Sequence, residues 1–358
     1  MKKSAYKHGI FLLPVILLSL SLSAQEVTKE YHEEYNAGAA TTLQINNRYG
    51  DVIIDSWDND QVVVDVKVTL ELPDRERAEK LLQYISVEFT QNGDVISAKT
   101  VIDDKFNFSG WGGGNKRFSI DYSVRMPVKS SLSLTNKYGN ANVDELKGLA
   151  EFDIKYGNIT IGKLTRGNEK PLNRLSIAYG KGSIDEAGWI DLMVRYSSGL
   201  DITSGQAFLL DSKYSKVNIG EVSSVVGESK YDNLTIDNIN NLVLENGYTE
   251  VKIGTLNKKL DYNGSYGSFT VNSVPSGFES IDLNTRYMGV NLGIEENADY
   301  NLEARVSYGG LKYNEENFIN KRRIIENNTR EIQGVVGKNE NPEAYVNVTA
   351  SYGSVRLF

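Results

Sequence analysis

The sequence predicts an all-β protein whose larger part is a parallel β-solenoid, and a repeated phrase is the main reason. Tyr-Gly or Tyr-Ser followed by alternating apolar residues recurs along most of the 358 residues. From Tyr138 to Tyr308 the successive spacings are 18, 23, 17, 18, 17, 17, 18, 21 and 21 residues. Such regularity indicates one structural unit copied many times. The anchoring tyrosines are Tyr49, Tyr138, Tyr156, Tyr179, Tyr196, Tyr214, Tyr231, Tyr248, Tyr266, Tyr287, Tyr308 and Tyr352.

Apolar residues alternate on both sides of each tyrosine, but the phase of the alternation changes there. Leu43 and Ile45 lie six and four positions before Tyr49, whereas Val52 and Ile54 lie three and five positions after it. Alternation with a period of two indicates a strand with one buried face, so the phase change indicates a bend. We expect glycine at the bend because it adopts backbone angles closed to other residues. The glycines that follow a tyrosine are Gly50, Gly139, Gly157, Gly180, Gly267, Gly309 and Gly353.

Each unit is therefore strand, corner, strand and turn, a rung of about 17–23 residues. A single rung cannot bury its inner face, so the rungs must stack in parallel and in register. Right-handed coiling is the expected hand because parallel crossovers favour it. The tyrosines would then form a structural ladder of stacked rings along a corner. A surface on which sugars stack is the alternative for the same tyrosines.

The chain divides into five segments. Residues 1–24 are predicted to be a signal peptide, 25–130 an N-terminal strand and helix module that caps the solenoid, and 131–313 the regular repeats. Residues 314–342 are a polar inserted loop or hairpin with the basic triplet Lys321 to Arg323, and 343–358 are the last rung. In the cap, Pro73 and Asp74 predict the start of one short helix.

The first residues predict export. Three lysines precede an apolar run from Ile10 to Leu22, with cleavage expected after Ala24 and, as the alternative, after Ser23. The run is too short for a permanent transmembrane helix. Without cysteine the chain has no disulfide, thiolate metal site or lipid attachment site of the lipoprotein type. Losing the leader takes the net charge from −8 to −11, which disfavours nucleic acid as a partner. The expected location is the periplasm, the outer membrane or the cell surface.

Candidate catalytic residues are scarce, and we expect no catalytic residue, cofactor or metal site. Once His8 leaves with the leader, His32 remains near the mature terminus, which argues against a Ser-His-Asp triad. The glycine-rich run from Gly110 to Gly114 lacks the Gly-Lys-Ser/Thr of a phosphate loop and is read as a connection. Two acidic sets are candidates, one for a calcium site and the other for polysaccharide-cleaving carboxylates. They are Asp51, Asp55, Asp58 and Asp60 for calcium, and Asp185, Asp201 and Asp237 for cleavage.

Several phrases in order resemble the "putative adhesin" family of bacterial envelope proteins. They are Asn47 to Val52, Trp57-Asp58, Ala78 to Lys80, Tyr122 to Pro127, and Asn136 to Gly139. The resemblance implies a β-solenoid without catalytic residues and an adhesin-like binding or scaffold role in the cell envelope. The implied partner is an envelope or surface polysaccharide or protein. The alternatives are a β-helix polysaccharide lyase or hydrolase, and a structural element that assembles end to end.

Overall fold

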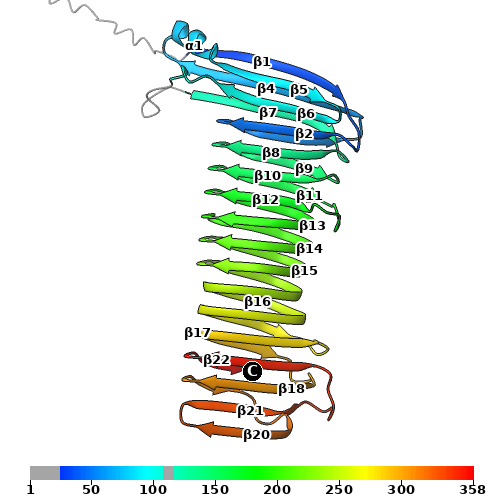
Figure 1. Ribbon diagram of the computed structural model, residues 1–358, viewed down its shortest axis with the longest axis vertical. Coiled ribbons are helices and arrows are strands. Elements are labelled where there is room, and N and C mark those ends of the chain that lie inside the picture. Colours follow the sequence, from blue (N-terminus) through cyan, green and yellow to red (C-terminus); the bar gives the residue numbers. More distant parts are fainter. Residues whose placement is uncertain (1–24, 108–116) are drawn as a thin grey trace, which may run out of the picture.

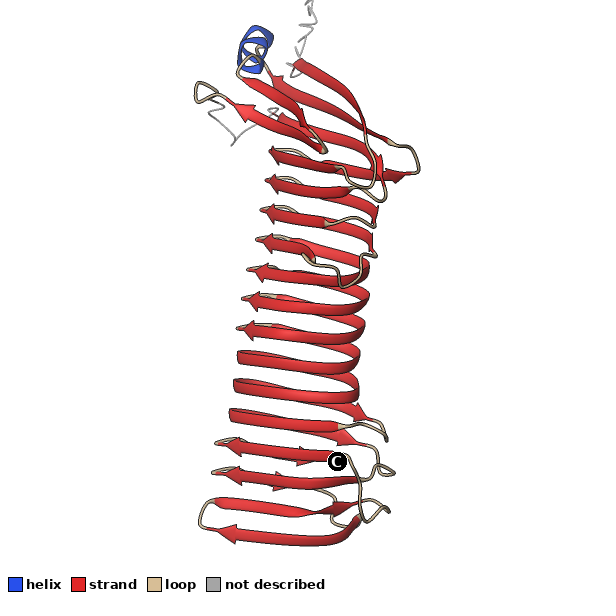
Figure 2. Ribbon diagram, turned by 45° about the vertical axis from the view of Figure 1, so that its right-hand side comes forward, coloured by secondary structure: helices blue, strands red, loops and turns tan. Residues whose placement is uncertain are grey.

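The computed structural model describes residues 25–107 and 117–358. In these ranges the chain is mostly β-strand with one short helix, and its 23 strands belong to one large, largely parallel sheet. Figures 1 and 2 show a single tall stack, with helix α1 (Arg75–Leu82) at the N-terminal end. Over the same ranges, no helix has the length and apolar character needed to span a membrane. The predicted signal peptide and the run Gly110 to Gly114 lie outside the described residues.

The middle of the stack consists of parallel windings that pair in register. Its strands are β8 (Ser131–Lys137), β9 (Ala141–Leu146), β10 (Ala150–Lys155), β11 (Ile159–Leu164), β12 (Asn173–Ala178), β13 (Lys181–Arg195), β14 (Gly199–Lys213), β15 (Lys216–Lys230), β16 (Asn233–Val274) and β17 (Ser280–Ile294). Ile184 pairs with Ile202, and Leu192 with Leu210. Because the pairing is in register, equivalent side chains form columns. One inward column is Ile161, Ile184, Ile202, Ile219 and Ile236, each at most 2% exposed.

The N-terminal module extends both sides of the stack beyond the winding at Tyr49. Its strands are β1 (Gln25–Asn36), β2 (Thr42–Arg48), β3 (Val52–Trp57), β4 (Gln61–Leu72), β5 (Ile85–Asn92), β6 (Val95–Ile102) and β7 (Arg117–Pro127). On one side, β6 pairs with β2 and β5 pairs with β6. On the other side, β7 pairs with β3, β4 with β7, and β1 with β4. The predicted helix is confirmed as α1, whose first turn is capped by the Asp74 carboxylate accepting from the Arg77 amide at 3.1 Å. Ala78 and Leu81 are its buried residues.

The C-terminal end corrects the expectation that residues 343–358 form the last rung. Its strands are β18 (Tyr300–Ser307), β19 (Leu311–Lys312), β20 (Phe318–Glu326), β21 (Thr329–Val336), β22 (Tyr345–Ser351) and β23 (Val355–Leu357). Strand β22 inserts between β17 and β18 and pairs in parallel with both. In this slot both of its edges are hydrogen-bonded, which a terminal position would not provide. Within 314–342, β20 and β21 form an antiparallel hairpin that continues the sheet from β18 (Figure 1).

Candidate functional site: the tyrosine row

The structure brings the twelve anchoring tyrosines together in one row along an edge of the stack, the tyrosine row. Neighbouring ring centroids are 4.6–5.2 Å apart and the interplanar angles are 1–17°. From Tyr138 onward every tyrosine of the row is 39–59% exposed. The spatial order ends Tyr287, Tyr352, Tyr308, because β22 inserts before β18. The row is therefore a continuous aromatic surface that faces solvent.

The backbone at each corner differs from the sequence-based expectation. The tyrosine itself, and not the following glycine, has the left-handed conformation, with φ of 50–66° at all twelve positions. Among the glycines after a tyrosine, Gly267 alone has positive φ. Glycine is needed for a different reason: a Cβ at Gly139, Gly157 or Gly180 would lie within 3.0 Å of the glycine backbone one winding away. These corners require glycine because the backbones approach closely.

The middle corners use polar side chains in place of glycine. Ser197, Ser215, Asp232 and Thr249 follow their tyrosines, and all are buried. Along this column the amide of one residue donates to the side chain of the next: the Ser197 amide donates to Ser215 Oγ at 3.1 Å, and the Ser215 amide to Asp232 Oδ1 at 2.6 Å. The Asp232 amide donates to Thr249 Oγ1 at 3.3 Å. This polar column ties the windings together beneath the tyrosine row.

Face-to-face stacking determines what the tyrosine row can bind. Ten of the twelve rings have a tyrosine on both faces, and Tyr49 has Tyr138 on one face and Phe118 at a tilt of 44° nearby. The ring faces are therefore occupied by other rings, so a sugar cannot stack on them within the row. Ring edges and phenolic hydroxyl groups remain accessible, at a repeat of about 5 Å set by the strand spacing. Such a row offers hydrogen bonds to an elongated polar ligand.

A column of cationic side chains runs beside the tyrosine row. The residue before the tyrosine is basic in seven windings. Arg286 stands apart from the others, and the remaining six positions pair in register through Ala178. We call them the basic column: Arg48, Lys137, Lys155, Arg195, Lys213 and Lys230. The sequence shows a basic residue before many of the repeated tyrosines, but only the strand register shows that these basic side chains lie in one column.

Part of the basic column is neutralised by neighbouring acids. Lys155 pairs with Asp153 at 3.2 Å, Arg195 with Asp211, and Lys230 with Glu228 at 2.6 Å. The Glu228 hydrogen bond raises the pKa of Lys230. The other three make no ion pair within the described residues; Arg48 and Lys213 lie over the rings of Tyr49 and Tyr214. Arg48, Lys137 and Lys213 are therefore available to pair with an anionic group of a binding partner.

The candidate carboxylates for calcium binding and for cleavage are not brought together. Asp185 and Asp237 are exposed and three windings apart, and Asp201 lies in another column, where it accepts from Asn218 at 2.5 Å. Asp51 accepts from the Asn140 amide at 2.7 Å. Over residues 25–107 and 117–358 no group of three His, Asp or Glu side chains is arranged to hold a metal ion.

His32, near the predicted mature terminus, lies within β1. Its Nδ1 is 2.6 Å from Asp65 Oδ1 and its Nε2 is 3.1 Å from Glu34 Oε1. These hydrogen bonds, chiefly the one to Asp65, raise its pKa above 6.5. Both partners are exposed acids and no nucleophile takes part, so the arrangement is a surface ion cluster.

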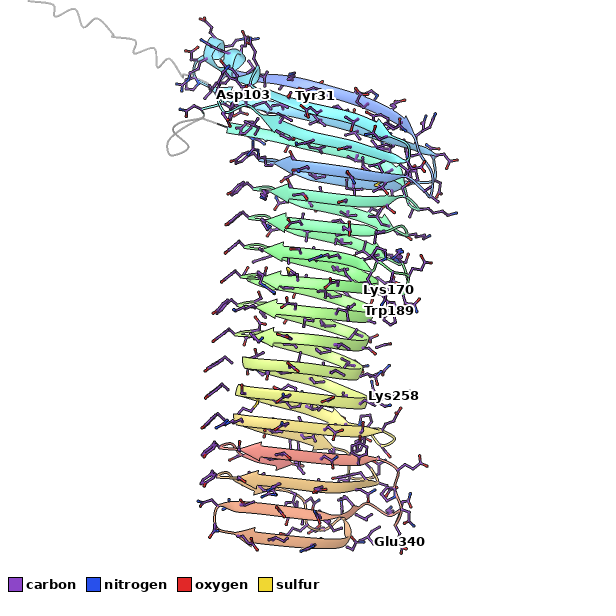
Figure 3. The ribbon with its side chains drawn as sticks, viewed as in Figure 1. Tyr31, Asp103, Lys170, Trp189, Lys258 and Glu340 are labelled. Carbon is purple, nitrogen blue, oxygen red and sulfur yellow. The ribbon has the colours of Figure 1, made fainter. Side chains whose placement is uncertain are left out.

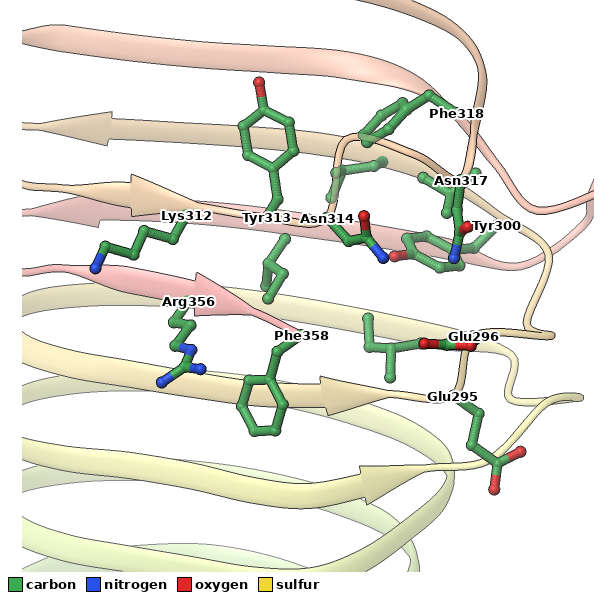
Figure 4. A pocket seen from close by; sticks show the side chains of 14 residues that line it. Glu295, Glu296, Tyr300, Lys312, Tyr313, Asn314, Asn317, Phe318, Arg356 and Phe358 are labelled. Carbon is green, nitrogen blue, oxygen red and sulfur yellow. The ribbon is translucent and has the colours of Figure 1, made fainter.

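A cavity of about 400 Å³ lies at the C-terminal end of the core (Figure 4). Burial raises the pKa of Tyr300, in its wall, to about 12. Strand β19 stops after two residues, whereas the facing sheet continues from β18 into β21 and β20. The cavity is therefore the place where one side of the core ends before the other.

The fold and the row define an elongated, sheet-rich protein with an aromatic edge. No protein-family model matches the sequence, and no curated protein matches it. Solved structures similar to the chain over most of its length include bacterial proteins described as adhesins. One is a "putative cell adhesion protein" from Clostridium sporogenes, with 11% identity, 92% of this chain and 99% of that chain covered, and a TM-score of 0.22.

Two further structures are described as a "putative adhesin". The one from Bacteroides fragilis has 11% identity, covers 63% of this chain and 97% of its own, and has a TM-score of 0.30. The one from Parabacteroides distasonis has 9% identity, covers 92% and 97%, and has a TM-score of 0.27. At these scores the likeness decides neither the fold nor the function of the chain.

Proposed function

We propose that the chain is an exported, non-enzymatic β-solenoid, coiled right-handed, that acts as an adhesin-like binding scaffold in the bacterial cell envelope. The observation that carries this proposal is the tyrosine row with the basic column in register beside it. Hydroxyl donors and cations repeat along the same edge at the strand spacing. An elongated partner with regularly spaced hydroxyl and carboxylate groups, an acidic polysaccharide of the envelope or cell surface, matches both.

Two structural features support a scaffold. The windings share one continuous core, so the edge that carries the tyrosine row is held along the whole stack. The free cations Lys137 and Lys213 lie several windings apart on that edge, so a long ligand contacts both while a single sugar contacts one.

Cosedimentation with polygalacturonate and with neutral dextran tests the proposal. We expect the protein to bind polygalacturonate in preference to dextran, and Lys137→Ala with Lys213→Ala to weaken that binding at least about tenfold, as lost charge-assisted hydrogen bonds would. The matched control is Lys170→Ala with Lys258→Ala, because Figure 3 places both lysines at the opposite edge of the stack. Equal binding by the two double variants, or release of reducing ends from the polysaccharide, would contradict the proposal.

A further inference from the structure

The two ends of the stack each present a strand with an unpaired edge. Among the described strands β1 pairs with β4 alone, and β20 pairs with β21 alone. Figure 1 shows β1 at the N-terminal end and β20 at the C-terminal end. These strands are 12 and 9 residues long, so each edge offers a row of backbone N–H and C=O groups without strand partners.

The two edges carry opposite charge. Strand β1 has four glutamates and one lysine, whereas β20 has one lysine, two arginines and one glutamate. Some of this charge is paired locally: Lys67 lies 3.2 Å from Glu26, and Glu315 lies 3.0 Å from Lys321 and 3.8 Å from Arg323. These pairs are exposed and therefore weak, so each edge keeps its sign. Two β1 edges repel each other, as do two β20 edges, while β1 and β20 attract.

Strand β20 is also the least covered strand of the sheet. Ile319 and Ile325 are 41% and 57% exposed, and seven of its nine residues are exposed. Charged side chains on an edge ordinarily prevent association of sheets. Here the charge prevents only like ends from meeting, and it leaves apolar surface to be buried by an edge of opposite sign.

We infer that β20 of one copy pairs with β1 of a second copy, so that the chain assembles head to tail through its sheet. The contact joins two different surfaces and leaves a free β1 and a free β20 at the ends, so it propagates as a linear assembly unless the geometry closes a ring. Strand β20 extends the side of the stack that is formed by the strands preceding each tyrosine in the sequence. Strand β1 extends the other side, which is formed by the strands following each tyrosine. Successive copies are therefore rotated about the stack axis. This inference stands independently of polysaccharide binding.

Charge reversal tests the pairing by sedimentation velocity of the purified protein over a range of concentration and salt. The first variant combines Lys321→Glu, Arg322→Glu and Arg323→Glu, which makes both ends acidic. The second combines Glu26→Lys, Glu30→Lys and Glu34→Lys, which makes both ends basic. We expect the wild type to form species that grow with concentration and shrink with salt. Each variant alone should associate at least about tenfold more weakly.

Mixing separates the proposed interface from a general charge effect. The two variants together should assemble again, because each acidic end then meets a basic end, and a chain carrying both sets of changes should assemble by itself. The matched control reverses three lysines elsewhere, Lys170→Glu, Lys181→Glu and Lys258→Glu, and should behave as wild type. Circular dichroism checks that each variant is folded. A wild type that stays monomeric at low salt, or a mixture no larger than its components, would overturn the inference.

Discussion

Gly157 lies so close to Gly139 in the neighbouring winding that a Cβ on Gly157 would fall within 3.0 Å of the Gly139 carbonyl group. The contact is backbone on backbone, so no side chain can rotate away. The same relationship continues from Gly180 to Gly157 and from Gly139 to Gly50. Glycine at these corners sets how closely the windings stack.

We therefore predict that Gly157→Ala lowers the free energy of unfolding by about 1–3 kcal/mol or more, because the windings must separate locally. The matched control is Gly247→Ala, where nothing lies within 4 Å of the new Cβ and φ is not positive. That change should be neutral or stabilise by about 0.4–1 kcal/mol. Urea unfolding of both variants measures the difference, and equal stability of the two would contradict the close-approach explanation.

The left-handed backbone of Tyr214 predicts an unusual order of substitutions. Tyr214→Ala and Tyr214→Gly both remove a ring that stacks on Tyr196 and Tyr231 at 5.1 and 4.8 Å. Alanine keeps the unfavourable φ of 54°, whereas glycine adopts it without strain. We expect the glycine variant to be more stable than the alanine variant by about 1 kcal/mol. Thermal unfolding decides this; the usual order in strands, with alanine more stable, would show that the strain is absent.

Buried Asp232 predicts a pH effect on stability. Burial raises its pKa above 3.8, although hydrogen bonds from Ser229, Ser215 and Lys230 act in the opposite direction. A carboxyl group that binds its proton more tightly in the folded state opposes folding when ionised. This unfavourable contribution is present above the folded pKa and disappears as the pH falls below 3.8. Relative to Asp232→Ser, which repeats the residue type of Ser215, the wild type should gain stability on acidification from pH 7 to 4.

Removing the hydrogen-bond acceptor at position 232 should lower the free energy of unfolding more than replacing it with another acceptor. Asp232→Ala leaves the buried Ser215 amide and the Lys230 amide without their acceptor, at a cost of about 1–3 kcal/mol for each buried donor. Urea unfolding at pH 7 should therefore rank Asp232→Ser above Asp232→Ala. The reverse order would mean that the polar column does not hold these corners together.

His32 predicts a second pH effect of the same sign, in which stability is again greater at lower pH. Its pKa is raised above 6.5 by hydrogen bonds to Asp65 and then Glu34. The stabilisation is fully present below pH 6.5 and is lost as the pH rises through the folded pKa. NMR titration of the imidazole should give a pKa above 6.5, lowered more by Asp65→Asn than by Glu34→Gln. An unshifted titration, or equal effects of the two variants, would rule out the hydrogen-bonded arrangement at β1.

Local patterns were enough to find the repeat, the two inward-facing arms and the short helix. The alternation of apolar residues around each tyrosine depends on side-chain direction in a strand, which is a local property of period two. Asp74 and the helical spacing of Ala78 and Leu81 are also local, and the structure confirms α1 there. In the candidate site the tyrosines could be named from the sequence, because each belongs to its own copy of the phrase.

Tertiary structure alone decided which copies are neighbours. The chain order places Tyr352 last, yet its ring lies between Tyr287 and Tyr308, because β22 finds hydrogen-bonding partners on both edges only in that slot. The positive φ of the tyrosines and the need for glycine beside them follow from stacking one winding on the next. The basic column and the free edges of β1 and β20 likewise depend on pairing between distant segments, which is a property of the stack and not of any one repeat.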